Sequence, residues 1–267
     1  MDIDRLRRIL EYSRYYQEEI KNKVSNFYSF TGITRDTDVL NILQIVRPIL
    51  RKKGFLVLEI PFADREIGAL CYKGNALGYV VINTSLPRAN VNFAVCHEIY
   101  HVFYSEKEFG SKVEFADGYY SEQKEELAAN IFAGMLLMPE TGFRHMYTLF
   151  KNESQGNEKD TMIRLMSYYQ APYMAVLIRC YELELTEVSR VSEELLNADS
   201  ENIKIQLRRL WLDDSILEAS NKDDYAHLES LVTKTGSEGI RNGYFNERTL
   251  KKVIRNMQSL YMEIKGE

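Results

Sequence analysis

The sequence is short of the residues that mark several classes of protein. Cysteine occurs three times, as Cys71, Cys96 and Cys180, an odd number at wide spacing that excludes a disulfide framework and a zinc knuckle. No apolar run is long enough to span a membrane, and residues 1–5 do not lead into the apolar stretch of a signal peptide. We therefore expect reduced, mostly buried thiols in a cytoplasmic protein that has no membrane partner.

Positive charge is also scarce. The 34 Lys and Arg residues are outnumbered by 39 Asp and Glu residues, which gives a net charge of -5 and a pI near 5.6. Such a chain has no overall attraction to nucleic acid or to an anionic membrane. Its content of 45% apolar and 27% charged residues is ordinary for a globular protein, and 267 residues can bury a sizeable core in one large domain or two.

Only four histidines are present, and two of them stand four residues apart in the segment His97-Glu98-Ile99-Tyr100-His101. On a helix these two side chains share a face and can bind one metal ion, while Glu98 can act as a base on a water at that ion. This is the HExxH pattern of zinc hydrolases. The flanking residues are apolar on most sides, which predicts a buried helix. The alternative is a core helix with hydrogen-bonded histidines and an ion-paired glutamate, in which all three polar groups would need partners.

A zinc site of this kind needs a third protein ligand, and the next predicted helix offers several. Ser121 fits the N-cap, residues 124–138 are rich in helix formers, and Pro139 ends the helix. Its first turns carry Glu122, Glu125 and Glu126. A solvated charge favoured by the helix dipole is the alternative role for each of these glutamates.

Glu126 is our predicted third ligand, with Glu125 and Glu122 as rivals. It shares a helix face with Ala129 and Ala133, whose small side chains let two helices approach closely. The same face carries Asn130, which can orient a ligand by a hydrogen bond.

The two motifs together resemble the ImmA/IrrE family of metallopeptidases. Residues 126–139 contain Phe-Ala and Leu-Leu-Met-Pro segments that match the family pattern residue for residue, and the resemblance covers residues 35–185. The chain departs from the pattern at Asn92-Phe93-Ala94, where members often have Arg-Phe-Thr, and at Tyr100, where glycine is common. The resemblance implies zinc ligands at His97, His101 and Glu126, a catalytic base at Glu98, and a small antiparallel sheet before the motif.

Hydrophobic spacing predicts an α+β fold. Residues 2–28 and 37–53 are predicted helices, the second interrupted by Pro48 and ended by Gly54. Three strands are predicted, with a hairpin joining the last two, at residues 55–60, 67–72 and 78–83. We expect the small antiparallel sheet to pack on a zinc-binding helix pair and a mostly helical C-terminal half to follow. We divide the chain into a metallopeptidase domain, residues 1–185, and a helical region, residues 186–267, that recognises a substrate or partner.

The C-terminal half is helical in pattern and carries no chemical motif. Some members of the family carry a helix-turn-helix, and residues 162–169 and 173–184 are predicted helices, but the second offers only Arg179 beside two glutamates. We therefore predict no direct nucleic-acid binding and interpret the basic stretch 248–255 as a solvated helix face. The residues expected to form the core of the tail are Trp211, Leu228, Leu231, Leu250, Val253, Met257, Leu260 and Tyr261.

These patterns predict a zinc-dependent endopeptidase in which Glu98 assists the attack of water on a peptide bond. The family resemblance implies a narrow role, the cleavage of a specific regulatory protein such as a transcriptional repressor. The alternative is a regulatory or toxin–antitoxin binding protein with a structural or sensory metal site, which would have no need of Glu98. Tyr119, Tyr120 and His145 lie near enough in sequence to stabilise an oxyanion, although a surface or packing role is favoured for each.

Overall fold

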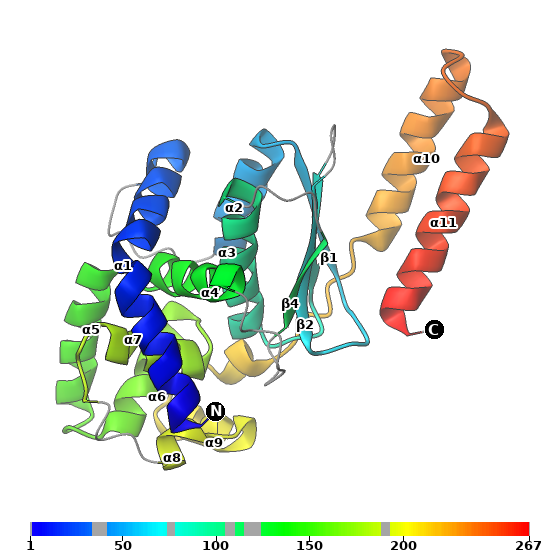
Figure 1. The fold of residues 1–267 in the computed structure, drawn as a ribbon. Helices are drawn as coiled ribbons and strands as arrows, with labels where there is room; N and C mark the ends of the chain where they lie inside the picture. The colour runs from blue at the N-terminus through cyan, green and yellow to red at the C-terminus, as the bar shows by residue number, and fades with distance from the viewer. Residues whose placement is uncertain are drawn as a thin grey trace.

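The computed structural model describes residues 2–33, 42–73, 78–104, 110–114, 124–187 and 193–266. It has an α+β fold, as predicted, in which helices dominate and one mixed sheet lies near the middle (Figure 1). The first helix, α1 (Ile3–Thr31), is capped by Asp2 and ends at Gly32, whose φ of 74° suits glycine. No helix among these residues is long and apolar enough to cross a membrane.

Helix α2 (Ile42–Lys52) shows one departure from the prediction, since Pro48 lies inside the helix and does not interrupt it. Ile42, Val46 and Leu50 recur at helical spacing and are each 1% exposed, so the packing of this stripe outweighs the local cost of proline. Gly54 ends the segment with a φ of 85°, as predicted. Residues 37–41, the start of the predicted helix, lie outside the described residues.

The sheet contains strands β1 (Phe55–Ile60), β2 (Ile67–Lys73), β3 (Gly78–Asn83) and β4 (Gly110–Glu114), in the order β1-β3-β2-β4. Strands β2 and β3 form the predicted antiparallel pair, although the connection at residues 74–77 lies outside the described part of the chain. The prediction of an antiparallel sheet was wrong for β1, which pairs with β3 in parallel. The sheet is therefore mixed.

Asn83 explains how the chain reaches this arrangement. The connection from β1 to β2 crosses the end of β3, because β3 lies between them. There the buried Asn83 side chain accepts a hydrogen bond from the Phe62 backbone N–H and donates to the carbonyls of Asp64 and Ile67. The Asn83 side-chain amide thus binds the connection near both of its ends. No local sequence pattern predicts these contacts.

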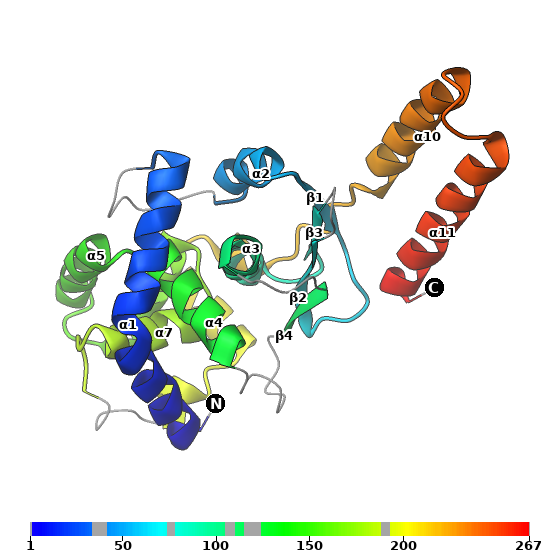
Figure 2. The same ribbon diagram turned by 45° about the horizontal axis from the view of Figure 1, so that its top comes forward.

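Three helices lie in layers on the inner face of the sheet. Helix α3 (Arg88–Tyr104) packs on β2, α4 (Lys124–Leu137) packs on α3, and α1 packs on α4. Both ribbon views show the same order, from α1 through α4 and α3 to the sheet (Figures 1 and 2). The main hydrophobic core fills these layers, so α3 is covered by protein on both sides.

The remaining helices of the body follow α4 and extend the same core. They are α5 (Glu140–Glu153), α6 (Glu158–Tyr169), α7 (Tyr173–Glu182), α8 (Glu193–Leu196), α9 (Ser200–Arg209) and the short 3-10 helix η2 (Asp214–Leu217). Ile203, Leu207 and Ile216 are buried in that core. Residues beyond 186 therefore help to fill the interior of the body.

Helices α10 (Tyr225–Arg241) and α11 (Glu247–Lys265) form a hairpin that projects from the outer side of the sheet (Figures 1 and 2). Only its base is anchored, where Leu228, Tyr261 and Ile264 pack against a small cluster of sheet residues. The predicted tail core was wrong for four of its eight residues, which are exposed: Trp211 (96%), Leu231, Val253 and Leu260. The other four are half-buried, and two of them, Leu228 and Tyr261, pack at the base of the hairpin. Helical spacing identified apolar faces correctly but could not show that the chain itself covers them.

Candidate metal centre

The HExxH residues lie in the C-terminal half of α3, a helix buried along most of its length. His97, Glu98 and His101 are 1%, 0% and 7% exposed. Polar groups this deeply buried are costly unless each has a partner or a ligand. The partners of the two histidines come from α4, where the small residues Ala129 and Ala133 are fully buried in the layer next to α3, as the sequence predicted.

His97, His101 and Glu126 converge on one point. The two Nε2 atoms lie 3.0 Å apart, and the Glu126 carboxylate oxygens lie 3.0 Å from His97 Nε2 and 3.5 Å from His101 Nε2. One ligand atom from each residue falls within 4.8 Å of the others, which makes the three a possible metal site among the described residues. The structure thus brings together the three side chains predicted as metal ligands.

This donor set fits a divalent metal ion. Four donors placed tetrahedrally at about 2.0–2.2 Å from zinc lie roughly 3.3–3.5 Å from each other, within a few tenths of an ångström of the observed separations. His97 Nδ1 lies 2.9 Å from Asn130 Oδ1, which only accepts, so Nδ1 carries a proton and Nε2 presents a lone pair in the neutral ring. A lone pair facing the Glu126 carboxylate requires a cation between them, either a proton or a metal ion.

Contacts within the cluster shift the pKa values of Glu126 and His101 in opposite directions. Burial would raise the pKa of Glu126, but hydrogen bonds and charge attraction from His101 and His97 outweigh it and lower the pKa far below its ordinary value. Burial would likewise lower the pKa of His101, but the hydrogen bond to Glu126 and the charges of Glu98, Glu126 and Glu125 raise it. Glu126 is therefore held as a carboxylate, the charge state in which it can ligate a metal ion.

The rival glutamates are placed differently from Glu126. Glu125 Oε1 lies 3.7 Å from His101 Nδ1, the ring nitrogen that faces away from the convergence point. Glu122 lies outside the described residues. Asn130, expected to orient a ligand, contacts His97 Nδ1 and so holds that ring with Nε2 toward Glu126.

Glu98 faces the sheet next to the metal-ligand candidates. The Cys71 thiol on β2 hydrogen-bonds to the Glu98 carboxylate. Burial raises the pKa of this thiol, and the negative charge of Glu98 raises it further. The sequence analysis missed this contact, because nothing in the pattern pairs a strand residue with the motif. Cys96 is fully buried as core, as predicted, and Cys71 and Cys180 are also buried free thiols.

Tyr100, the unusual residue inside the motif, is housed between α1 and α4. Its ring packs against Phe132 and Tyr104, and edge-on against His101 at 5.7 Å between centroids. Lys23 donates a hydrogen bond of 2.9 Å to the Tyr100 hydroxyl and lies over the ring. Helix α1 thus helps to enclose the Tyr100 ring, which a glycine at this position would not require. No pattern in the sequence indicates this contact.

The oxyanion candidates gain no support here. Tyr119 and Tyr120 lie outside the described residues. His145 is exposed on α5, which begins after the end of α4 that is remote from Glu126. The two helices predicted at residues 162–169 and 173–184 correspond to α6 and α7, and Arg179 is 2% exposed and bonds to the Met138 carbonyl and Glu182. Its guanidinium is therefore buried and hydrogen-bonded within the protein, where it is not accessible to nucleic acid.

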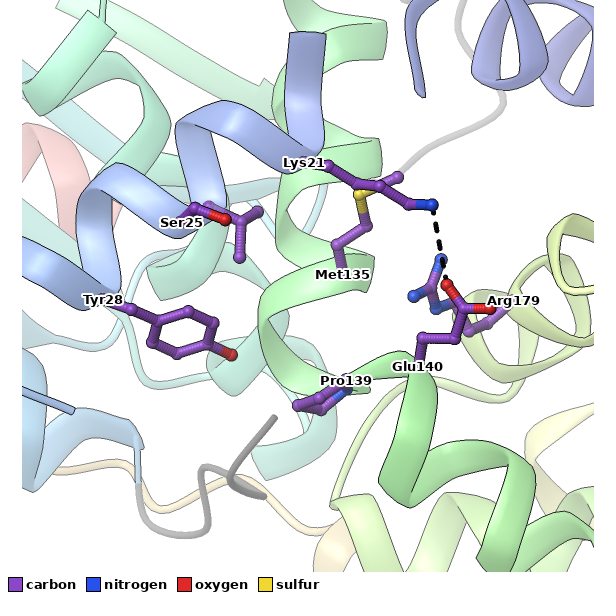
Figure 3. A pocket seen from close by; sticks show the side chains of 8 residues that line it. Lys21, Ser25, Tyr28, Met135, Pro139, Glu140 and Arg179 are labelled. Carbon is purple, nitrogen blue, oxygen red and sulfur yellow. Dashed lines mark ion pairs between the residues drawn. The ribbon is translucent and has the colours of Figure 1, made fainter. Parts of the chain in front are cut away.

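A pocket of about 280 Å³ lies elsewhere, among α1, the end of α4, the start of α5 and the last turn of α7 (Figure 3). Lys21 and Glu140 form an ion pair there, and Arg179 lies beside them. Glu126 and Pro139 are separated by 13 residues of α4 and its end, which is roughly 20 Å along a helix. The pocket is thus distinct from the metal-ligand cluster.

Comparisons with known proteins give one result. Residues 50–181 match the Peptidase M78 family model, described as the IrrE N-terminal-like domain. A search of curated proteins found no match to the chain. The matched segment contains the sheet strands β1 to β4 and both motif helices, and it omits α1 and everything after α7. This match over residues 50–181 supports the ImmA/IrrE peptidase family that the two motifs predict.

Proposed function

We propose that this protein is a zinc-dependent endopeptidase that cleaves a specific regulatory protein such as a transcriptional repressor. The observation that carries the proposal is the convergence of His97, His101 and Glu126 beside a buried Glu98. The membership of residues 50–181 in a peptidase family supports the same reaction class. A narrow substrate range is consistent with the large part of the chain outside the family segment.

In this mechanism His97, His101 and Glu126 hold zinc, which supplies a Lewis acid for the scissile carbonyl and for a water molecule. Glu98 accepts the proton of the attacking water at its carboxylate and then delivers it to the leaving amine. Asn130 keeps the proton on His97 Nδ1, so that Nε2 stays available as a ligand. The burial of Glu98 and the two histidines keeps bulk water away from the proton transfer.

The second candidate is a regulatory or toxin–antitoxin binding protein whose metal site is structural or sensory. Two observations weigh against it. A structural site gains nothing from an ionisable side chain at Glu98, whose burial costs free energy. Arg179, the cation on the second of the two helices considered for DNA binding, is buried and paired with Glu182. We retain the proposal of a cytoplasmic protein without direct nucleic-acid or membrane partners.

We further propose that the region after residue 186 contributes to substrate choice. Zinc chemistry needs only α3 and α4, yet the chain continues through a projecting hairpin with exposed apolar side chains at Leu231, Val253 and Leu260. Exposed apolar residues on one element suit contact with another protein. The domain boundary at 185/186 stays a proposal, and the burial of Leu207 in the main core favours a functional boundary nearer to α10.

Glu98→Gln tests the proposed reaction. The amide has nearly the shape of the carboxylate but is no base, so cleavage should fall by about 10²–10⁴-fold while zinc content and the circular dichroism spectrum stay unchanged. The assay incubates the parent and the variant with candidate repressors, beginning with any that are encoded beside the gene, and follows the fragments by mass spectrometry. A Glu98→Gln protein that cleaves at the parental rate would contradict the mechanism. A zinc-loaded parent that only binds such a repressor would favour the second candidate.

A further inference from the structure

The two ring nitrogens of His101 face two different carboxylates. Glu126 Oε1 lies 3.5 Å from Nε2, and Glu125 Oε1 lies 3.7 Å from Nδ1. These nitrogens lie on different edges of the imidazole, and neighbouring residues on a helix point about 100° apart. The consecutive glutamates at the start of α4 therefore straddle the His101 ring, one at each nitrogen.

We propose, on the basis of the proposed metal centre, that Glu125 is a positioning residue that accepts a hydrogen bond from the Nδ1–H of His101 and so directs Nε2 toward the metal. The other histidine shows the completed form of this arrangement, since His97 Nδ1 lies 2.9 Å from Asn130 Oδ1. A histidine that ligates through one nitrogen needs its other N–H fixed by an acceptor, because that contact sets both tautomer and ring orientation. Among the described residues, Glu125 is the acidic side chain that meets His101 at Nδ1.

The position of Glu125 also argues against its being the third ligand. A metal ion held by both histidines lies at their Nε2 atoms, which are 3.0 Å apart. Glu125 approaches the other side of the His101 ring, whereas both oxygens of Glu126 face the Nε2 pair. In this proposal Glu126 binds the metal ion, and the adjacent Glu125 orients His101, which is one of its ligands.

The Glu125 contact needs to shorten by only a small amount. Its 3.7 Å exceeds the usual hydrogen-bond range of about 2.7–3.2 Å, but the side chain is 30% exposed and has room to move. The two Nε2 atoms must also separate from 3.0 Å to roughly 3.3 Å to accept a tetrahedral ion. A shift of that order in the His101 ring, together with a turn of the Glu125 side chain, is enough to close the hydrogen bond.

The test compares Glu125→Ala with Glu125→Gln in the full chain. Alanine removes the acceptor, whereas glutamine keeps a carbonyl oxygen at nearly the same place. Glu125→Ala should weaken zinc affinity by about 10–100-fold, and Glu125→Gln should recover part of that loss. Asn130→Ala is the benchmark for losing the equivalent acceptor on His97. Lys124→Ala is the matched control, an exposed neighbour on the same helix, and should bind zinc like the parent.

Zinc affinity is measured by competition with a chelator, and the ring N–H of His101 is followed by nitrogen-15 NMR in the metal-free and zinc-loaded proteins. We expect a protected Nδ1–H signal in the parent and in Glu125→Gln that is lost in Glu125→Ala. An unchanged signal and affinity in Glu125→Ala, or a glutamine variant as impaired as the alanine variant, would overturn the proposal. These readouts use no peptide substrate, so they are unaffected if the protein proves not to be a peptidase. A parent that binds no zinc would instead refute the metal centre itself.

Discussion

The α3–α4 pair and the α10–α11 hairpin are both two-helix units, but they place their side chains in opposite ways. In the first, histidine and glutamate side chains are buried and oriented by specific partners, with exposures of 0–7% for the HExxH polar residues. In the second, no residue of α11 is buried, and leucine and valine side chains face solvent. Buried polar groups are retained at a cost, which points to chemistry, whereas uncovered apolar groups point to contact with another molecule.

Among the predicted effects, the loss of zinc on removal of a metal ligand should be the largest. If no zinc were lost, the buried polar residues of α3 and α4 would not form a metal site. Purified parent protein should hold about one zinc ion per chain, and His97→Ala or His101→Ala should abolish it, because a site with two protein ligands binds weakly. Glu126→Gln should weaken zinc binding, while Glu98→Gln should not. Elemental analysis of protein prepared without chelators provides the measurement.

The chain supplies its own controls for this experiment. His145 and His227, the other two histidines, are both exposed on helices remote from the motif in sequence. Replacing either with alanine should leave the zinc content unchanged. Parent protein without metal, or His97→Ala protein with a full complement, would refute the site.

A second prediction sharpens the comparison through stability. Leu207 in α9 is fully buried in the main core, so Leu207→Ala should lower the free energy of unfolding by about 2–5 kcal/mol. Leu260 in α11 is 59% exposed, so the same change there should cost less than about 0.5 kcal/mol. Urea denaturation followed by circular dichroism measures both.

This pair of variants also tests where the chain divides. A cut near residue 186 would remove Ile203 and Leu207 from the core, so we expect such a truncation to lose stability as Leu207→Ala does. Leu260→Ala, in the hairpin, should not lower the stability in this way. Equal losses from Leu207→Ala and Leu260→Ala would show that the hairpin belongs to the same cooperative unit as the body.

The sequence predicted the grouping of the candidate metal ligands better than the packing of the chain, and the reason is physical. Metal binding requires particular residue types at a fixed helical spacing, so His97, Glu98 and His101 are visible as a local pattern. Glu126 required a second helix, but its small neighbours Ala129 and Ala133 indicated close approach. The β2–β3 pair was also local, because a hairpin joins strands that are adjacent in sequence.

What could not be predicted depends on contacts between distant segments. The direction of β1 follows from Asn83 holding a connection that crosses β3, and the housing of Tyr100 depends on Lys23 from α1. The hairpin is the clearest case. An apolar stripe shows that one face of a helix is suited to burial. The same kind of stripe occurs on a core helix such as α2 and on a projecting helix such as α11, so it does not show what covers that face.

The last and smallest predicted effect concerns that uncovered stripe. Val253 and Leu260 lie seven residues apart, on one face of α11, and Leu231 is similarly exposed on α10. If the hairpin contacts the protein substrate, replacing all three residues with alanine should lower kcat/KM for that protein by about tenfold or more, since truncated contact residues each cost up to a few kcal/mol. Cleavage of a short peptide spanning the same bond should be unchanged, because the metal centre is untouched.

Leu149→Ala is the matched control for the triple variant. Leu149 is 42% exposed on α5, so its replacement removes apolar surface from the body and leaves the hairpin intact. Circular dichroism and zinc content should be the same for the parent and both variants, which separates a recognition effect from unfolding. A triple variant that cleaves the protein substrate at the parental rate would show that the exposed apolar residues of the hairpin do not contribute to substrate choice. Equal losses from Leu149→Ala would place the contact on the body instead.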